Sequence, residues 1–345
     1  MSVNKKLTVS ASPHVRAPHT VTGIMLDVII ALIPSLIAAV VIFGYRVLMV
    51  TLVCVGSAVL SEYVSRIVMK RHQTITDLSA VVTGLLLAFN LPASIPLWIA
   101  ALGSVIAIVV VKQMFGGIGQ NFVNPALASR IILLMSFPSQ MANWATESKF
   151  VTTTATPLAV LSRPTEEMTS FAGASVTNEP ELPSLLNMFL GLHGGSFGEV
   201  CSVALIIGGI YLVVRKVISP VIPLCYIGTV AVLMLIAGKG NFEFVAYQIL
   251  GGGLLLGAIF MATDYTTSPV SFKGKIIFAV GCGIITTVIR LFGSLPEGVS
   301  FSIILMNLLV PHIEKLTTAK PFGTPKKDRK AEKEAKKAEK EAAKA

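Results

Sequence analysis

A short run of threonines near the middle of the chain is the first group of side chains that could support chemistry. It occupies residues 152–156 as Thr-Thr-Thr-Ala-Thr and is followed by Pro157 and Leu158. A hydroxyl is a weak nucleophile unless a base lies beside it, and this run contains no acid, base or thiol. These threonines therefore offer points of attachment or hydrogen bonding and no catalysis of their own.

Charged side chains inside long apolar stretches form a second group. Arg130 is the clearest case, because it follows Asn124 in an otherwise apolar segment. An arginine at membrane depth needs a carboxylate partner or an anionic ligand, and both readings stay open here. The matching place in the second half of the chain nominates Asp264 as the carboxylate. The remaining charged residues in or beside apolar stretches are Asp27, Glu62 and Asp77.

Cysteine and histidine spacing predicts no metal site within this chain. The four cysteines are scattered without a C-x-x-C pair, and the five histidines contain no H-x-x-x-H pair. Structural zinc and iron–sulfur sites need clustered ligands of these types. We expect any iron–sulfur chemistry to belong to partner proteins.

Composition predicts the elements that must position these residues. Of the 345 residues, 53% are hydrophobic and only 13% are charged, whereas soluble domains carry about 25% charged residues. Apolar runs of membrane-spanning length recur along most of the chain, which predicts an all-α membrane protein. The ten predicted spans cover residues 24–43, 47–68, 77–90, 96–112, 122–136, 200–218, 221–238, 245–262, 275–292 and 299–313.

A weak internal repeat divides these spans into two sets of five. Gly84 and Gly253 each begin a Gly-Leu-Leu-Leu sequence, and one apolar span later each half has a glycine-marked break, at residues 115–121 and 292–298. An odd number of spans per half predicts inverted repeats, with a binding site at their interface. The predicted segments are an N-terminal segment (1–22), two repeats (23–136 and 198–313), the loop between them (137–197) and a basic tail (314–345).

The interface site would draw on polar and glycine residues at these breaks. Gly116 and Gly117 lie in the first break, and Asn124, Arg130 and Asp264 are the polar candidates for ligand binding or pairing. The alternative is that the glycines only permit tight turns and close helix packing. No strand precedes Gly116, so a dinucleotide-binding glycine loop is excluded.

Charge distribution predicts orientation and argues against nucleic-acid binding. Much of the net charge of +10 lies in residues 326–344, at the end of the tail. Eleven Lys and Arg residues flank the spans on the side of the N-terminus, against five on the opposite side. The positive-inside rule therefore places both termini in the cytoplasm and the 137–197 loop outside.

Several motifs together resemble one family of membrane redox subunits. They are Ser12-Pro13-His14, Gly116-Gly117 through Asn124-Pro125-Ala126, Ala262-Thr263-Asp264, and Glu297-Gly298 through Met306-Asn307. On these residues the chain is similar to the D subunits of Rnf ion-translocating electron-transport complexes and to the B subunits of sodium-pumping NADH:quinone reductases. The resemblance covers about residues 12–311, nearly the whole membrane part.

The resemblance implies two flavins. In that family a threonine of a Ser/Thr-Gly-Ala-Thr motif carries FMN through a phosphoester, and Thr153-Thr154-Ala155-Thr156 matches it with Thr156 as the acceptor. Thr154 stands where the family usually has glycine. A separate flavin transferase would make the bond, because no base lies near Thr156. The family also implies a noncovalently bound riboflavin, but no residue of the sequence indicates where it binds.

The implied function is that of a membrane subunit in a multi-subunit pump of the prokaryotic plasma membrane. Electrons would pass between ferredoxin and NAD⁺, coupled to export of Na⁺ or H⁺. The implied partners are other membrane and peripheral subunits, including a second subunit with covalent FMN and iron–sulfur subunits. The alternative is a channel or transporter for a small solute built on the same inverted repeat.

Overall fold

The computed structural model describes residues 20–143, 158, 161, 183–191, 195–198, 201–293 and 297–318, and every regular element within them is helical. The first half contains α1 (Val21–Phe43), α2 (Arg46–Val68), the 3₁₀ turn η1 (Ile75–Asp77), α3 (Ser79–Phe89), α4 (Leu97–Val105), the π-helical η2 (Ile106–Gln113), α5 (Pro125–Ser136) and α6 (Pro138–Met141). After α9 (Leu185–Leu190), the second half contains α10 (Ser202–Val214), α11 (Val221–Ala237), α12 (Phe242–Leu250), α13 (Leu254–Leu256), the π-helical η3 (Gly257–Met261), α14 (Phe272–Phe292) and α15 (Val299–Thr317).

Polar residues at the helix ends explain several of these boundaries. The Thr20 hydroxyl accepts a hydrogen bond from the Gly23 N–H at 3.1 Å and begins α1, which ends at Gly44 with φ +82°. Asn124 caps α5 in the same way, with proline at the first helical position. Side-chain acceptors of this kind satisfy N–H groups that have no partner within the helix.

Each of the ten predicted spans contains a helix, but the helices differ in length. Four of them, α1, α2, α14 and α15, have 19 to 23 residues and are apolar enough to cross a membrane. Helix α12 and the following α13–η3 unit form one further candidate, bent by 63° at the break that begins at Gly251. Helices α3, α5, α10 and α11, and α4 together with η2, are apolar but shorter.

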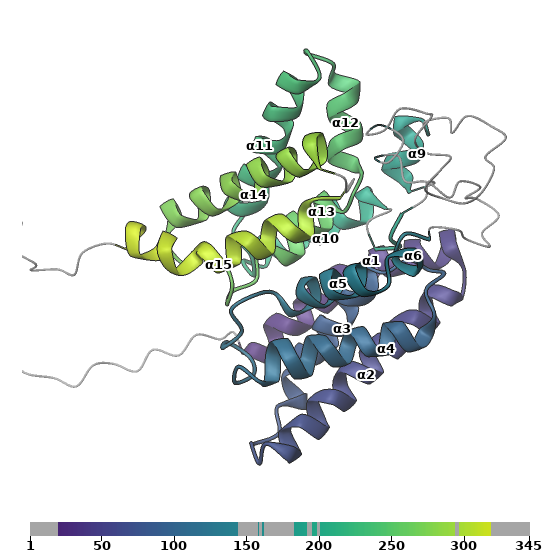
Figure 1. The fold of residues 1–345 in the computed structure, drawn as a ribbon, viewed down its shortest axis with the longest axis vertical. Helices are drawn as coiled ribbons and strands as arrows, with labels where there is room; N and C mark the ends of the chain where they lie inside the picture. Colours follow the sequence, from purple (N-terminus) through teal and green to yellow (C-terminus); the bar gives the residue numbers. More distant parts are fainter. Residues whose placement is uncertain are drawn as a thin grey trace, which may run out of the picture.

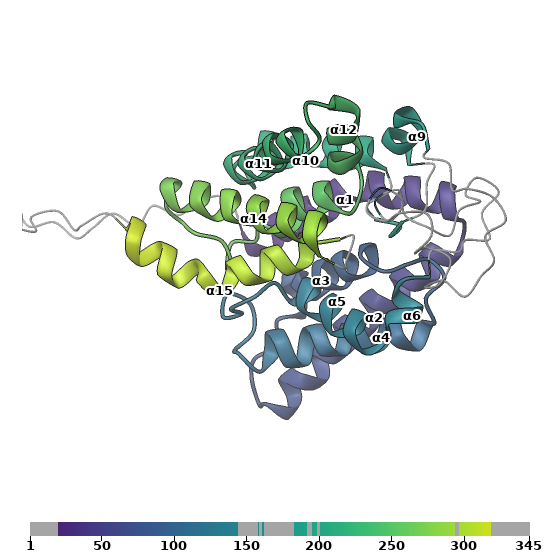
Figure 2. The same ribbon diagram turned by 45° about the horizontal axis from the view of Figure 1, so that its top comes forward.

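The helices form two groups that correspond to the two halves of the chain (Figure 1). Helices α2 to α6 pack together in one group, and α11 to α15 in the other, with α1 packed along α10 between them (Figure 2). A Cβ atom on Gly208 of α10 would overlap the carbonyl oxygen of Ala31 in α1. Glycine therefore lets these two backbones touch at the junction of the halves.

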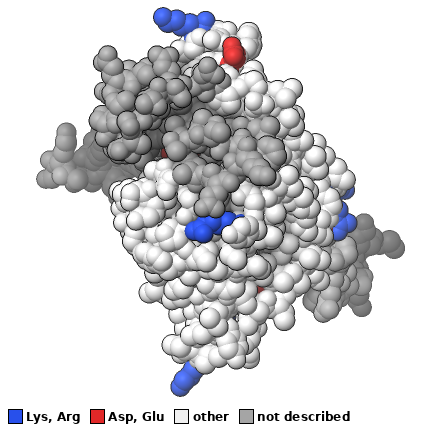
Figure 3. Space-filling model, turned by 90° about the vertical axis from the view of Figure 1, so that its right-hand side faces the viewer, with Lys and Arg blue, Asp and Glu red and all other residues white. Residues whose placement is uncertain are grey.

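The surface of the described helices is apolar where a soluble protein would be charged. Val41, Leu52, Val214 and Ile236 each leave about 70% of their side chains exposed. Charged side chains are sparse on the face drawn in Figure 3. Apolar surface of this extent on span-length helices is that of an all-α membrane protein with several spans.

Candidate functional site

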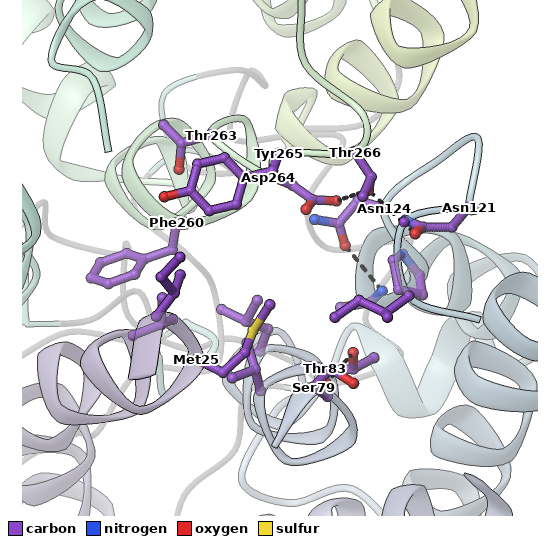
Figure 4. Close-up of a pocket in the computed structure, with 18 of the residues that line it drawn as sticks. Met25, Ser79, Thr83, Asn121, Asn124, Phe260, Thr263, Asp264, Tyr265 and Thr266 are labelled. Carbon is purple, nitrogen blue, oxygen red and sulfur yellow. Dashed lines mark hydrogen bonds between the residues drawn. The ribbon is translucent and has the colours of Figure 1, made fainter. Parts of the chain in front are cut away.

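A cavity of about 350 Å³ lies between the two halves of the molecule (Figure 4). Its walls come from α1, α3 and the segment before α5 on one side, and from α10, η3 and the segment after η3 on the other. The apolar part of the lining includes Met25, Val28, Leu86, Leu212, Ile218 and Phe260. The polar part includes Ser79, Thr83, Lys112, Asn121, Asn124, Thr263, Asp264 and Thr266.

Asn124 ties the two halves together at this cavity. Its side-chain oxygen accepts from the N–H groups of Ala126 and Leu127 at 3.1 and 3.4 Å and so caps α5. Its amide nitrogen donates to the carbonyl oxygen of Met261, at the end of η3, at 3.3 Å. The predicted candidate Asn124 thus lines the cavity and is held rigidly by both halves.

Asp264 reaches the same cavity from the segment after η3, beyond the end of the predicted span. Its carboxylate accepts from the hydroxyls of Thr266 and Thr267 at 3.0 and 3.2 Å. The Thr266 hydroxyl also lies 3.2 Å from the side-chain oxygen of Asn121. Burial raises the pKa of Asp264, and the threonine hydroxyls oppose that rise. This carboxyl therefore ionises less readily than an exposed aspartate.

A fully buried ion pair adjoins the opposite wall of the cavity. Lys112, which lines the cavity, donates to Glu62 at 2.9 Å and to the Ser79 hydroxyl at 2.6 Å. The second oxygen of Glu62 accepts from Thr74 at 2.9 Å and from Gln113 at 3.0 Å. Glu62 is 0% exposed, and its two oxygens accept three hydrogen bonds, one of them from the cation of Lys112, which compensates for its burial.

The predicted pairing of Arg130 with Asp264 is wrong. The Arg130 guanidinium pairs with Glu297, which lies just before α15, and donates to the Ser300 hydroxyl at 2.6 Å. Glu297 is close because α15 packs against α5, whereas Asp264 is held by its own threonines on the segment after η3. Of the two open interpretations, a carboxylate partner or an anionic ligand, the structure shows a carboxylate, but the repeat position selected the wrong one.

The two glycines of the first break lie in a tight turn, which was one of their two possible roles. Gly116 and Gly117 have φ values of +127° and +103°, which only glycine adopts without strain. The cavity is lined by Gly119 and Asn121 from this break, and not by Gly116 or Gly117. The tight-turn interpretation therefore describes these two glycines better than ligand binding does.

Comparison with known proteins decides the family. The profile of the NQR2, RnfD, RnfE family matches residues 8–323. The chain is 48% identical to the D subunit of the Na⁺-translocating ferredoxin:NAD⁺ oxidoreductase complex of Acetobacterium woodii, over 94% of this chain and 98% of that one. The chain belongs to the NQR2, RnfD, RnfE family.

Two further relatives fit the same family. The D subunit of the proton-translocating ferredoxin:NAD⁺ oxidoreductase complex of Clostridium ljungdahlii is 42% identical over 92% of this chain and 96% of its own. The D subunit of the ion-translocating oxidoreductase complex of Stutzerimonas stutzeri is 36% identical over 88% and 92%. The family resemblance predicted from the motifs is thereby confirmed.

In this NQR2, RnfD, RnfE family member, the predicted attachment run from Thr153 to Thr156 lies outside the described residues. Leu158, two positions further on, is described and is only 2% exposed. Its side chain packs on Gly251 and Gly252, at the break between α12 and α13. Arg290 of α14 donates to the carbonyl oxygens of those same glycines at 3.1 and 3.2 Å.

Sequence reasoning missed Lys112, Leu158 and Arg290. The signals were present, since Lys112 is a cation next to an apolar span and residues 251–253 are three consecutive glycines inside another. A buried acid such as Glu62 requires a cation. However, only the packing of the helices identifies which cation that is.

Proposed function

We propose that this chain is the membrane subunit of a redox-driven ion pump of the ferredoxin:NAD⁺ oxidoreductase type. The support is near full-length similarity to D subunits whose names carry that activity. One of those names specifies Na⁺ and the other protons, so the proposal covers translocation of a small monovalent cation. Nothing in the relatives favours the alternative of a small-solute channel or transporter.

The proposed redox group of the outer loop is FMN, attached through a phosphoester to Thr156. The support is the match of Thr153-Thr154-Ala155-Thr156 to the attachment motif of the family. A bound flavin supplies electron transfer, which no side chain of the described residues can provide. A transferase would form the ester, because the threonine hydroxyl has no base close to it in sequence.

The proposed second flavin is riboflavin, held noncovalently in the cavity between the halves. A volume of about 350 Å³ is within the range of small-molecule sites, roughly 300–1,000 Å³. Met25, Phe260 and their apolar neighbours suit the faces of an aromatic ring system (Figure 4). Asn121, Asn124 and Thr263 offer hydrogen bonds to ring heteroatoms and ribityl hydroxyls. The chemistry of this lining fits an uncharged flavin, and the cavity is the observation that carries the proposal.

The proposed topology puts both termini in the cytoplasm and the Thr156 flavin on the outside of a prokaryotic plasma membrane. The support is the eleven-to-five bias of Lys and Arg in the predicted loops. Electrons would then cross a hydrocarbon core about 30 Å thick, which requires carriers in neighbouring subunits, including a second covalent-FMN subunit and iron–sulfur subunits. In intact cells, a Ser170→Cys variant should react with an impermeant thiol reagent. Labelling only after lysis would contradict this orientation.

The cavity proposal is tested by filling the cavity. Thr83 lines it from α3, and its hydroxyl donates to the Ser79 carbonyl oxygen, at 2.9 Å (Figure 4). Thr83→Phe should leave covalent FMN in place and remove the flavin that acid or solvent extracts from the purified complex. The measurement is the ratio of extractable to covalent flavin, by chromatography and absorbance.

Two variants make this test decisive. Thr263→Phe fills the same space from the other half and should give the same loss. Val41→Phe adds the same kind of side chain on the exposed face of α1 and should retain both flavins. Extractable riboflavin retained in both cavity variants at the wild-type ratio would rule out this site.

A further inference from the structure

Arg66, in the last turn of α2, is a buried cation without a partner among the described residues. It is 7% exposed. Its Nε atom is buried with no hydrogen-bond acceptor, as is that of Arg130, but Arg130 pairs through its other nitrogens, whereas the Arg66 guanidinium makes no hydrogen bond or ion pair with any described residue. A buried guanidinium is costly unless an anion or several acceptors surround it. The position therefore calls for a ligand that carries negative charge.

The nearest carboxylate along the helix cannot serve. Glu62 lies one turn before Arg66 on α2, but Lys112 occupies one of its oxygens at 2.9 Å. Thr74 and Gln113 occupy the other oxygen. The charge of Glu62 is already neutralised, so Arg66 is left as the surplus cation of this end of the helix.

The turn after η2 lies directly against Arg66 and leaves room for it. A Cβ atom on Gly117 would overlap the Nη2 atom of Arg66, so the guanidinium covers a glycine that has no side chain. Three carbonyl oxygens at this turn already accept hydrogen bonds: that of Lys112 from Gly117, that of Gln113 from Gly116 and Arg71, and that of Gly117 from Gln120. The turn therefore fixes the position of Arg66, but the Arg66 guanidinium makes no hydrogen bond to it.

A second guanidinium reaches the same turn. Arg71 Nη1 donates to the Gln113 carbonyl oxygen at 3.3 Å, and Lys70 is exposed between the two arginines. Arg66 and Arg71 thus both lie against residues 113–117. Two guanidinium groups complement the negative charge of a phosphate group and can donate to its several oxygens.

The surroundings of this basic cluster are those of a membrane surface. Ile67 and Val68 at the end of α2 are 52% and 74% exposed, and Met114 and Phe115 at the end of η2 are 63% and 50% exposed. Exposed apolar side chains beside a cation at a helix end suit acyl chains beside a headgroup. A free phosphate ion would make no use of this apolar surface.

We propose that Arg66 and Arg71, on the Gly116–Gly117 turn, bind the phosphate group of an anionic phospholipid at the end of α2. The occupant is a lipid of the surrounding leaflet, held by its phosphate at the guanidinium groups and by its acyl chains along the exposed residues of α2 and η2. This site is separate from the proposed riboflavin site, because Arg66 does not line the cavity.

The test uses the purified complex, stripped of lipid and reconstituted into bilayers that contain equal amounts of phosphatidylglycerol and phosphatidylcholine. Native mass spectrometry then measures the lipids that remain on this subunit. The wild-type protein should retain phosphatidylglycerol selectively. Arg66→Gln should reduce that selectivity roughly ten-fold, because charge-assisted hydrogen bonds to a phosphate are lost. Lys70→Gln removes the same charge from an exposed neighbour and should change the selectivity less than two-fold.

Two further variants protect the test against misfolding of Arg66→Gln. Arg66→Lys retains a cation and should retain most of the selectivity. Gly117→Ala displaces the guanidinium without a change of charge and should lose the selectivity. Phosphatidylglycerol retained equally by wild type, Arg66→Gln and Gly117→Ala would overturn the site.

Two more measurements distinguish a bound lipid from free phosphate and test whether Arg66 is accessible in the complex. If inorganic phosphate displaces the retained lipid and stabilises the lipid-free protein equally well, the lipid assignment fails. If the isolated chain binds phosphatidylglycerol but the complex does not, a neighbouring subunit covers Arg66, and the proposal is again overturned.

Discussion

Two long helices, α2 and α14, both end in an arginine that covers a glycine in the left-handed region. Arg66 of α2 lies on Gly117, and Arg290 of α14 lies on Gly252, which has φ +68°. Arg290 donates to the carbonyl oxygens of Gln248, Gly251 and Gly252. Arg66 donates to no described residue. Among the described residues, three carbonyl oxygens accept from the arginine at one helix end, and none accepts from the arginine at the other.

The difference arises from the backbone segment that lies against each arginine. The break between α12 and α13 interrupts helical hydrogen bonding, so carbonyl groups become available to Arg290. At the turn after η2, the carbonyl oxygens of Lys112, Gln113 and Gly117 accept from N–H groups of the turn itself, and that of Gln113 also accepts from Arg71. We infer that Arg290 is part of the framework that holds Leu158, and that Arg66 is left available for a ligand.

The largest expected effect is at Arg290. Arg290→Gln should destabilise the protein by about 4 kcal/mol, because several buried carbonyl groups lose a charged donor at once. Thermal unfolding of the purified protein in neutral detergent measures the loss. Arg215→Gln is the matched control, since Arg215 is 53% exposed and solvent screens its pair with Asp27, so this variant should lose much less stability. Equal losses in the two variants would contradict the structural role of Arg290.

Arg130 is a third buried arginine for this comparison, because its partner, Glu297, is a carboxylate from the other half of the chain. Removing one member of the buried Arg130–Glu297 pair should cost about 3 kcal/mol, since the remaining charge is left without its partner. A double-mutant cycle with Arg130→Gln and Glu297→Gln should show that the double variant loses less than the sum of the singles. Additive losses would mean that the two charges do not interact.

The glycine beneath Arg290 should matter less than the arginine itself. A Cβ atom on Gly252 would lie 2.8 Å from Arg290 Nη2 and overlap a methyl group of Leu158, at a φ that disfavours alanine. Gly252→Ala should therefore cost about 2 kcal/mol. Gly44→Ala, at φ +82° with no atom within 4 Å of the new Cβ, should cost only about 1 kcal/mol of backbone strain. A Gly252→Ala loss no greater than that of Gly44→Ala would show that Leu158 and Arg290 do not pack there.

The smallest expected effect is at Arg66. In neutral detergent without anionic lipid, Arg66→Gln should change stability by less than about 1 kcal/mol, because no described partner is lost. The difference between wild type and variant should grow when phosphatidylglycerol is added. A loss in lipid-free detergent as large as that of Arg290→Gln would contradict the comparison.

The helical architecture could be predicted from the sequence because apolar length and caps are local properties. Thr20 and Asn124 mark the starts of α1 and α5, and every predicted span contains a helix. The break at residues 251–253 lies inside the predicted span 245–262, where three consecutive glycines signal a change of direction. The inverted relation of the two halves stays a prediction.

The partners of buried charges could not be predicted in the same way. Arg130 meets Glu297 and Glu62 meets Lys112 only because distant helices pack together. The sequence indicates that a buried charge needs a partner but not which helix supplies it. The cavity could not be predicted for the same reason, because Met25, Asn124 and Asp264 line it from segments far apart along the chain.

The central proposal is that this protein carries electrons on a flavin attached covalently at Thr156. The most direct measurement is the intact mass of the denatured chain, with in-gel fluorescence, for wild type, Thr156→Ala and Thr153→Ala. The account predicts a mass higher than the polypeptide by one FMN less water in wild type and Thr153→Ala, and the bare polypeptide in Thr156→Ala. A wild-type chain of unmodified mass, or flavin that persists in Thr156→Ala and disappears in Thr153→Ala, would contradict it.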